Sequence, residues 1–181
     1  MSQSADEPQA EDDAPTGWFN LVWGVDRSVR YHMRREAFFV RWHRLNLFVA
    51  MLSSSASVVA LGYKISEEVP WIPLVGAAIA AIASSIDLLV GPLEQSKKHY
   101  ELRQRFTRLS QQICRDDHAD VHLLTERKCE RLDIEREEPP IYRALDLLCH
   151  VELLKARGEA GAENVPWYKR YTAHFLRWEG I

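Results

Sequence analysis

Two long apolar runs, separated by a short polar stretch, dominate the hydrophobic pattern of the chain. The first, Leu45–Tyr63, has 19 consecutive residues without a formal charge, and the second, Val69–Ile86, has 18. Beyond Asp87 the apolar character resumes as far as Leu93. A helix of 19 residues is roughly 28 Å long, close to the thickness of the hydrocarbon core of a bilayer. The pattern predicts two membrane spans, about 45–63 and 69–93.

Only Lys64–Glu68 lies between the two runs. Consecutive helices with so short a connection must turn back on each other, so the spans are expected to form a tight hairpin. A buried hairpin in a soluble protein is the alternative, because both runs are rich in Ser and Ala. Two adjacent runs of membrane length with basic flanks are rare in soluble cores, which favours the membrane.

The distribution of charge predicts the orientation of the hairpin. Six arginines lie between Arg27 and Arg44, and six Lys or Arg lie between Glu94 and Arg115. The connecting stretch carries Glu67 and Glu68 with only one lysine. Cytoplasmic flanks are enriched in Lys and Arg, so both termini are expected in the cytoplasm. The expected location is the inner (plasma) membrane, with the chain crossing it more than once.

The apolar spacing of a helix continues beyond both runs, which predicts helices that extend into the cytoplasm and pack there. The positions concerned are Phe38, Trp42, Leu45, Val49 and Leu52 in the first helix, and Leu102, Phe106, Leu109 and Ile113 in the second. Gly91-Pro92 is expected to kink the second helix. The predicted fold class is all-α, a two-helix transmembrane hairpin with long cytoplasmic helical extensions and extra C-terminal helices.

The remaining segments complete the domain organisation. Residues 1–16 are acidic and predict a disordered tail, and residues 17–157 form the main domain. Helix is expected through about Glu138, up to Pro139-Pro140, and again over Ile141–Arg157, stopped by Gly158. Residues 158–165 predict a linker.

Residues 166–181 predict a short amphipathic helix rich in basic and aromatic side chains. Trp167, Tyr168, Tyr171, Phe175 and Trp178 would insert into a membrane surface. Alternatively, they would pack on the cytoplasmic helices as part of a core.

The overall composition changes this picture little. A mean hydropathy of −0.29 and a net charge of −3 average over very different segments. The basic residues lie where a membrane anchor has them, so nucleic-acid binding is not expected. The three cysteines, Cys114, Cys129 and Cys149, fall in the predicted cytoplasmic part, where thiols stay reduced, and no disulfide is expected.

Small residues recur at every fourth position of the second run. Gly76, Ala80 and Ser84 form one stripe and Ala77, Ala81 and Ser85 a second, while Ser53, Ser54, Ser55 and Ser57 lie in the first run. Small residues let helix backbones approach closely in lipid, and serines hydrogen-bond across helices. Packing within one hairpin accounts for one stripe. Two stripes offer more surface than one hairpin needs, which suggests self-assembly.

Asp87 is the most informative single residue. A carboxylate within a span costs free energy unless it faces protein, water or a basic group, so it is a functional candidate. Its position near the cytoplasmic end also allows interfacial water or Lys97 to satisfy it. If hairpins assemble, a ring of Asp87 carboxylates would favour cations at a pore mouth. The candidate pore and assembly residues are therefore Asp87, Gly76, Ala80, Ser84, Ser53 and Ser57.

Cys114, His118 and His122 recur every fourth residue, a spacing that brings metal ligands to one face of a helix. No second paired motif accompanies them. The chain also has no phosphate-binding loop, no GxGxxG and no HExxH motif. No metal, cofactor or catalytic residue is assigned, and an enzyme is not expected.

The layout resembles the SLATT domain family, a two-transmembrane effector module of bacterial conflict systems. The resemblance covers roughly Tyr31 to Leu154 and rests on RYHMRREAFFVRWHRLN before the first run, HYELRQRFTRLSQQI after the second, and RLDIEREEPPIYRALDLLCHVELL. It implies self-assembly into a pore that damages the membrane of an infected cell. A separate sensor or nucleotide-signalling partner would trigger it. The family has no defining active site, so no functional residue is transferred.

The expected function is therefore an oligomeric membrane effector with the lipid bilayer and further copies of itself as partners. The alternative is a membrane anchor or adaptor that recruits cytoplasmic partners through its helical region.

Overall fold

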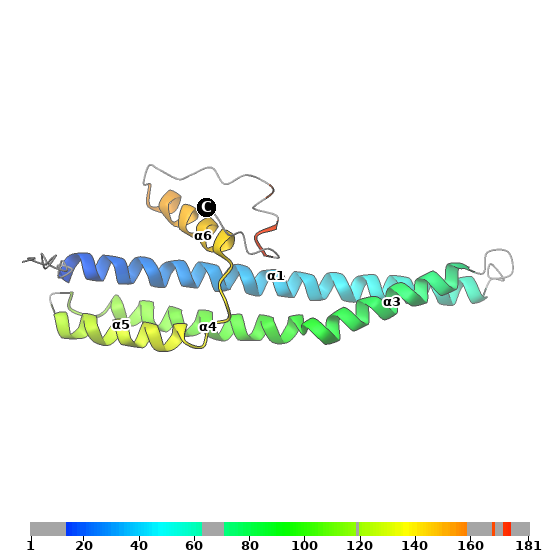
Figure 1. The fold of residues 1–181 in the computed structure, drawn as a ribbon, viewed down its shortest axis with the longest axis horizontal. Helices are drawn as coiled ribbons and strands as arrows, with labels where there is room; N and C mark the ends of the chain where they lie inside the picture. The colour runs from blue at the N-terminus through cyan, green and yellow to red at the C-terminus, as the bar shows by residue number, and fades with distance from the viewer. Residues whose placement is uncertain (1–13, 63–70, 119, 159–167, 169–171, 175–181) are drawn as a thin grey trace, which may run out of the picture. The chain divides into compact units, whose positions relative to one another are not determined.

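The computed structural model describes residues 14–62, 71–118, 120–158, 168 and 172–174. Its helices are α1 (Ala14–Gly62), α3 (Trp71–Val90), α4 (Pro92–Ile113), α5 (Val121–Glu135) and α6 (Arg143–Arg157) (Figure 1). Within these ranges there is no strand, which confirms the all-α class for this part of the chain. The chain forms two compact units, residues 32–101 and residues 1–31 with 102–181.

In the unit of residues 32–101, residues 32–62 of α1 lie antiparallel to α3. We call these two segments the antiparallel pair. His43 contacts Asp87 near one end, and Ser57 contacts Pro73 near the other. The pair buries few large side chains of its own and leaves most of its apolar surface exposed. The exposed side chains include Leu45, Phe48, Met51, Leu52, Val58, Leu74, Ile82, Leu88 and Leu89.

One described segment, Pro73–Ile113, contains a stretch that is long and apolar enough to cross a membrane, and only 11% of that stretch is buried. The stretch matches the second expected span. The first expected span, 45–63, ends outside the described residues and is not identified by the same criterion.

Gly91 separates α3 from α4. Its φ of 54° is in the left-handed region, which glycine adopts without strain. Pro92 then begins α4, where its missing N–H costs no helical hydrogen bond. The kink expected at this dipeptide therefore takes the form of a break between two helices.

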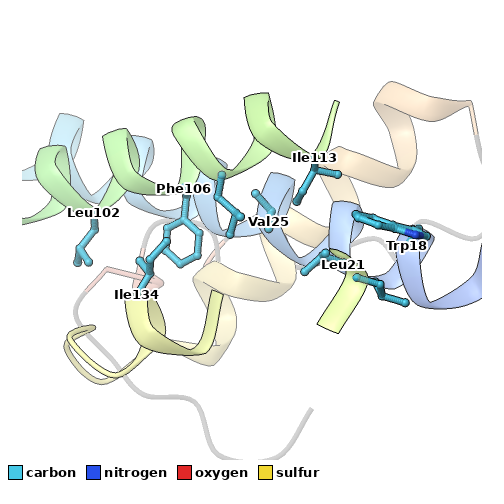
Figure 2. Close-up of a cluster of buried hydrophobic side chains, with 9 residues drawn as sticks. Trp18, Leu21, Val25, Leu102, Phe106, Ile113 and Ile134 are labelled. Carbon is cyan, nitrogen blue, oxygen red and sulfur yellow. The ribbon is translucent and has the colours of Figure 1, made fainter. Parts of the chain in front are cut away.

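The second unit has a buried core contributed by α1, α4 and α5 (Figure 2). Leu102, Phe106, Leu109 and Ile113 of α4 are all at most 3% exposed, so the face expected from their spacing is confirmed. They pack with Trp18, Leu21 and Val25 of α1 and with Leu124 and Ile134 of α5.

Two glycines of α1, seven residues apart, allow α5 to lie close to this helix. A Cβ on Gly17 would lie 2.7 Å from Leu124 Cδ2. A Cβ on Gly24 would overlap the guanidinium of Arg131. A side chain at either position would therefore require Leu124 or Arg131 to move.

The helix expected through about Glu138 is observed as α5, which ends at Glu135, but a turn that was not predicted separates it from α4. α4 ends at Ile113 and α5 begins at Val121, after a turn. Asp120 ends the turn by accepting hydrogen bonds from the backbone N–H groups of His122 and Leu123. An Asp that caps a helix N-terminus favours a new start over continuation.

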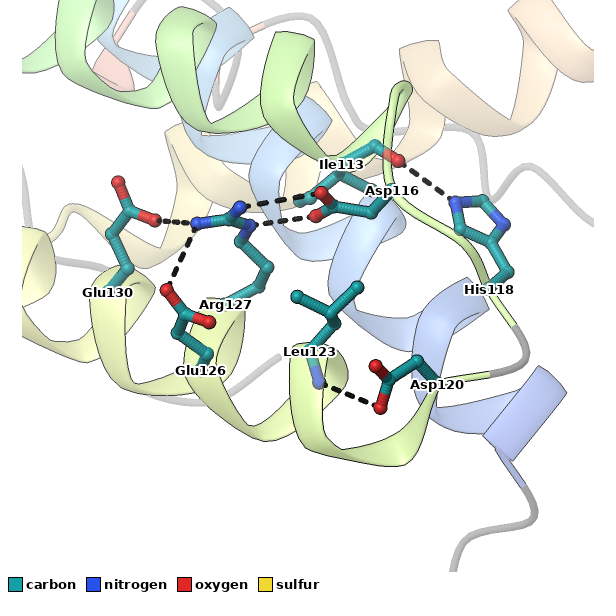
Figure 3. Close-up of polar contacts among 8 residues, drawn as sticks. All are labelled: Ile113, Asp116, His118, Asp120, Leu123, Glu126, Arg127 and Glu130. Atoms are coloured by element: carbon teal, nitrogen blue, oxygen red, sulfur yellow. Dashed lines mark hydrogen bonds and ion pairs between the residues drawn. The ribbon is translucent and has the colours of Figure 1, made fainter.

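Arg127 fixes the turn between α4 and α5 (Figure 3). Its Nε donates to Asp116 Oδ2 at 2.7 Å, and its Nη1 donates to Glu130 Oε2 at 3.0 Å. The hydrogen bond from Arg127 lowers the pKa of Asp116, and the same bond raises the pKa of Arg127. Both groups therefore stay charged at neutral pH.

α6 begins at Arg143 rather than at the expected Ile141, because Tyr142 has an extended backbone. It ends at Arg157, as expected, with Gly158 in the left-handed conformation at φ 73°. Tyr31 Oη accepts a hydrogen bond from the Tyr142 backbone N–H at 3.1 Å. A separate small cluster of buried residues holds α6: Tyr31, Ala144, Leu145, Leu148, Cys149 and Ala173.

The expected terminal segments fall mostly outside the described residues. α1 begins at Ala14, inside the sixteen-residue tail expected from the sequence. Of the predicted C-terminal helix, only residues 168 and 172–174 are described, and Ala173 is fully buried.

Candidate functional site

A polar cluster joins the two helices of the antiparallel pair at Asp87. His43 Nδ1 lies 2.9 Å from Asp87 Oδ1. Asn46 Nδ2 donates to the Ala83 backbone oxygen at 2.7 Å and to Asp87 Oδ1 at 3.3 Å. Asn46 follows His43 by three positions, and Asp87 follows Ala83 by four, so each helix presents both groups on one face.

Both contacts to the Asp87 side chain reach the same oxygen, Oδ1. No described residue bonds to Oδ2, and 31% of the side chain remains exposed. The carboxylate is thus held in place by α1 while one oxygen stays available. Such a group can take a cation, a water molecule or a donor from another chain.

Helix packing beside this cluster depends on Gly76. A Cβ at this position would lie 2.9 Å from the Ser53 backbone oxygen and would overlap Ser57 Oγ. Ser57 Oγ bonds to the backbone oxygens of Ser53, at 2.9 Å, and Pro73, at 3.2 Å. The serine and glycine candidates from the sequence therefore meet in one contact.

The stripe of small residues is only partly on the contact face. Gly76 and Ala80 are half-buried, but Ser84 is exposed, and Ala83 is buried in its place. A helix turns 100° per residue, so each step of four residues rotates the stripe by about 40°. By Ser84 the stripe has left the contact, and the contact face continues through Ala83 and Asp87. Assigning Ser84 to the same contact as Gly76 is not supported.

The second stripe, Ala77, Ala81 and Ser85, is exposed along its whole length. Ser85 Oγ bonds to the Ala81 backbone oxygen at 2.8 Å, within its own helix. The antiparallel pair therefore leaves a face of small residues uncovered.

His43 and Asn46 are the residues that the sequence analysis missed. Asn46 was counted within the uncharged run, and His43 lies just before it. In a hairpin, positions at equal distances from the centre of the loop lie opposite each other. With the loop predicted at 64–68, Asp87 lies opposite Leu45, which is within one helical turn of His43 and of Asn46. This rule, applied to the polar positions, would have identified them.

A second polar cluster lies outside the predicted spans. His32 Nδ1 and His99 Nδ1 are 2.9 Å apart, and both residues are 1% exposed. Arg35 lies over the ring of Phe39, with its Cζ 4.6 Å from the ring centroid. Burial, together with electrostatic interactions with His32, Arg35 and Lys98, lowers the pKa of His99 from 6.5 to about 3. His99 is therefore neutral at pH 7.

The candidate metal ligands do not share a helical face, because the turn between α4 and α5 separates them. Cys114 is exposed, and His118 Nε2 lies 2.9 Å from the Ile113 backbone oxygen. The His118 ring also stacks on Trp18 at 4.7 Å. Among the described residues, no group of three or more His, Cys, Asp or Glu could hold a metal ion. The contacts of His118 with Ile113 and Trp18 thus hold the turn against α1.

The other cysteine beside a histidine is also in a packed environment. Cys149 is fully buried in the cluster under α6. Trp23 Nε1 donates to His150 Nδ1 at 3.3 Å, which orients this ring toward α1.

Comparisons with known proteins give no match: no family model, no curated protein and no solved structure is similar to this chain.

Proposed function

We propose that the chain is a membrane effector. In this proposal the antiparallel pair crosses the bilayer as a hairpin, several copies assemble, and the assembly makes the membrane permeable to ions. The observation that carries the proposal is the exposed apolar surface of the pair, which surrounds a contact built from small and polar residues.

The contrast between the two units supports insertion of the pair. In the unit of residues 1–31 and 102–181, large apolar side chains such as Phe106 and Leu109 are buried. In the pair, Leu74 is 71% exposed and Leu88 is 85% exposed. Soluble monomers rarely leave large contiguous apolar patches exposed to water. Lipid is the solvent that such a surface favours.

Hydrogen bonding within the pair also suits a membrane. Ser54 and Ser85 bond to backbone oxygens one turn earlier in their own helices. Polar groups in hydrocarbon need partners inside the protein, and these serines have them. The orientation, with both termini cytoplasmic, rests on the arginines and lysines that flank the spans.

Two features support assembly. The stripe of Ala77, Ala81 and Ser85 is uncovered, and close approach of helices in lipid favours small residues at an interface. Asp87 keeps one oxygen without a described partner, and a ring of such oxygens would attract cations. The resemblance to the SLATT family points to the same function.

Ion leakage tests this proposal. Liposomes that contain the purified chain and a potassium-sensitive dye should leak, and Ala81→Leu should reduce leakage by blocking close approach. Ala56→Leu, which changes an exposed alanine of α1, is the matched control and should leak like the unmodified chain. Mass photometry of the same variants in mild detergent should give several copies, and fewer for Ala81→Leu. An unmodified chain that stays monomeric and does not leak would contradict the proposal.

A membrane anchor or adaptor is the second candidate. It is favoured by the separate core of α1, α4 and α5 and by the docking of α6, which form a helical unit able to present a surface to cytoplasmic partners. Replacing both spans with unrelated apolar helices separates the two candidates. An adaptor keeps its activity after this exchange, whereas a pore loses it.

A further inference from the structure

A groove of about 290 Å³ lies along one side of the antiparallel pair. Its walls are mainly the apolar side chains Trp42, Leu45 and Val49 of α1 and Ile79, Ile82 and Ile86 of α3. Leu45 and Ile82 are 61% and 60% exposed, so the groove opens to the surroundings of the pair. Its volume is at the lower limit for ligand pockets, about 300 Å³, which suits one alkyl chain better than two.

Asn46 adds one polar group to this wall. Its Nδ2 donates to the Ala83 backbone oxygen and to Asp87 Oδ1, both of which can only accept. These partners fix the orientation of the amide, so Oδ1 is the acceptor that remains. No described residue donates to it. Asn46 is half-buried, and a ligand that carries a hydrogen-bond donor would satisfy this acceptor.

Arg41 provides a positive charge beyond the groove. It precedes Leu45 by four residues and so lies on the same side of α1, about 6 Å nearer the cytoplasm along the axis. The residue is exposed and makes no ion pair with a described residue. Arg44 is also exposed, but it lies about 100° around the helix from Leu45. A phosphate at headgroup level would complement Arg41.

We propose that this groove binds a single-chain anionic phospholipid, a lysophospholipid. Its alkyl chain lies between Leu45 and Ile82, its free glycerol hydroxyl donates to Asn46 Oδ1, and its phosphate lies at Arg41. This ligand has a donor between the chain and the phosphate, as the order of Asn46 and Arg41 requires. A diacyl phospholipid has an ester in place of that hydroxyl and a second chain.

The inference rests on the proposed insertion of the pair into a bilayer, but not on assembly or leakage. Lysophospholipids arise by hydrolysis of one acyl ester of a diacyl phospholipid. The groove would therefore couple this chain to the breakdown of membrane lipid.

Native mass spectrometry of the full chain, released from phosphatidylcholine nanodiscs doped with palmitoyl lysophosphatidylglycerol, tests the inference. We expect one retained lysophosphatidylglycerol per chain. Its affinity should be about tenfold above that of lysophosphatidylcholine, and about tenfold above that of an analogue that lacks the free hydroxyl on the glycerol bearing the acyl chain. Arg41→Gln should lower retention about tenfold, and Arg44→Gln should not. Ile82→Phe, which narrows the groove, should lower it, whereas Leu88→Phe on the exposed surface should not.

Equal retention of the hydroxyl-free analogue, or of lysophosphatidylglycerol by Arg41→Gln, would overturn the inference. A disulfide between two copies of the Leu45→Cys variant would show that a second chain occupies the groove, and this result would also overturn the inference. Incorporation into nanodiscs is scored in the same samples. A chain that incorporates but retains no lysolipid contradicts this inference alone, and a chain that fails to incorporate contradicts the proposed function.

Discussion

His43 Nδ1 lies 2.9 Å from Asp87 Oδ1, which connects the end of one apolar run to the carboxylate that interrupts the other. Asn46 reaches the same oxygen, so two side chains of α1 hold one side chain of α3. This cluster sets the register of the antiparallel pair. It also explains how a carboxylate is tolerated in an otherwise apolar segment.

A double-mutant cycle should reveal coupling between His43 and Asp87. His43→Leu leaves the carboxylate with one partner fewer and should cost about 1–3 kcal/mol of unfolding free energy in detergent. Asp87→Leu should cost a similar amount. The double variant should be less destabilised than the sum, because neither polar group is then left without the other. Strict additivity would show that the contact contributes nothing.

Gly76→Leu should separate α1 from α3 locally. The new side chain would meet Ser57 Oγ and the Ser53 backbone oxygen, so about 1–3 kcal/mol of stability should be lost through overpacking. Ala78→Leu adds similar volume at an exposed position and should change stability by less than about 0.5 kcal/mol. Unfolding in increasing denaturant, with helicity followed by circular dichroism, measures both. Equal stability of the two variants would place Gly76 outside the helix contact.

Buried His99, which lies against His32, should make stability fall in acid. The pKa of His99 is lowered to about 3 in the fold and is 6.5 when exposed, so the unfolded chain takes up a proton first as the pH drops. The titration of His99 therefore leaves the free energy of unfolding unchanged above pH 6.5. Between pH 6.5 and about pH 3 it lowers that free energy by about 1.4 kcal/mol per pH unit.

His99→Asn removes this titration and keeps a hydrogen-bonding group near the position of Nδ1. The difference in unfolding free energy between the unmodified chain and this variant should therefore shrink as the pH falls from 6.5. Comparing the two proteins cancels the carboxylates that they share. A difference independent of pH over this range would show that His99 titrates normally.

Arg127 should matter more than other surface arginines of its unit. Its side chain and that of Asp116 are only 14% and 12% exposed, so Arg127→Met should cost about 2–3 kcal/mol. Arg105, which pairs with Glu137, is 37% exposed, and Arg105→Met should cost less than about 1 kcal/mol. Denaturant midpoints at neutral pH compare the two. Similar losses would mean that the turn between α4 and α5 does not depend on Arg127.

The features that follow from periodicity were predictable from the sequence. The spacing of Leu102, Phe106, Leu109 and Ile113 predicted a buried helix face, and this face is part of the core. Gly158 and Gly91-Pro92 marked a helix end and a break, because their backbone preferences are local.

Features that depend on contacts between distant segments were not predictable in the same way. The turn between α4 and α5 was missed because a single Asp cap and the Arg127 network interrupt a segment with helical composition. Asp87 was recognised as unusual, but its partners depend on the register of two helices. The exposure of Ser84 was not predicted, because positions four residues apart rotate gradually around a helix and so leave the contact face after two steps.

The sidedness of the chain in cells tests the central claim most directly. Cys114 and Cys129 are exposed in the structure, so a membrane-impermeant maleimide should label them only after the cells are permeabilised. A single cysteine at Ser66, in a chain whose native cysteines are changed to alanine, should be labelled in intact cells with a permeable outer envelope. That pattern is expected if the chain crosses the membrane twice with both ends inside. Labelling of both sites from the same side, or recovery of the protein in the soluble fraction, would contradict a membrane-spanning hairpin.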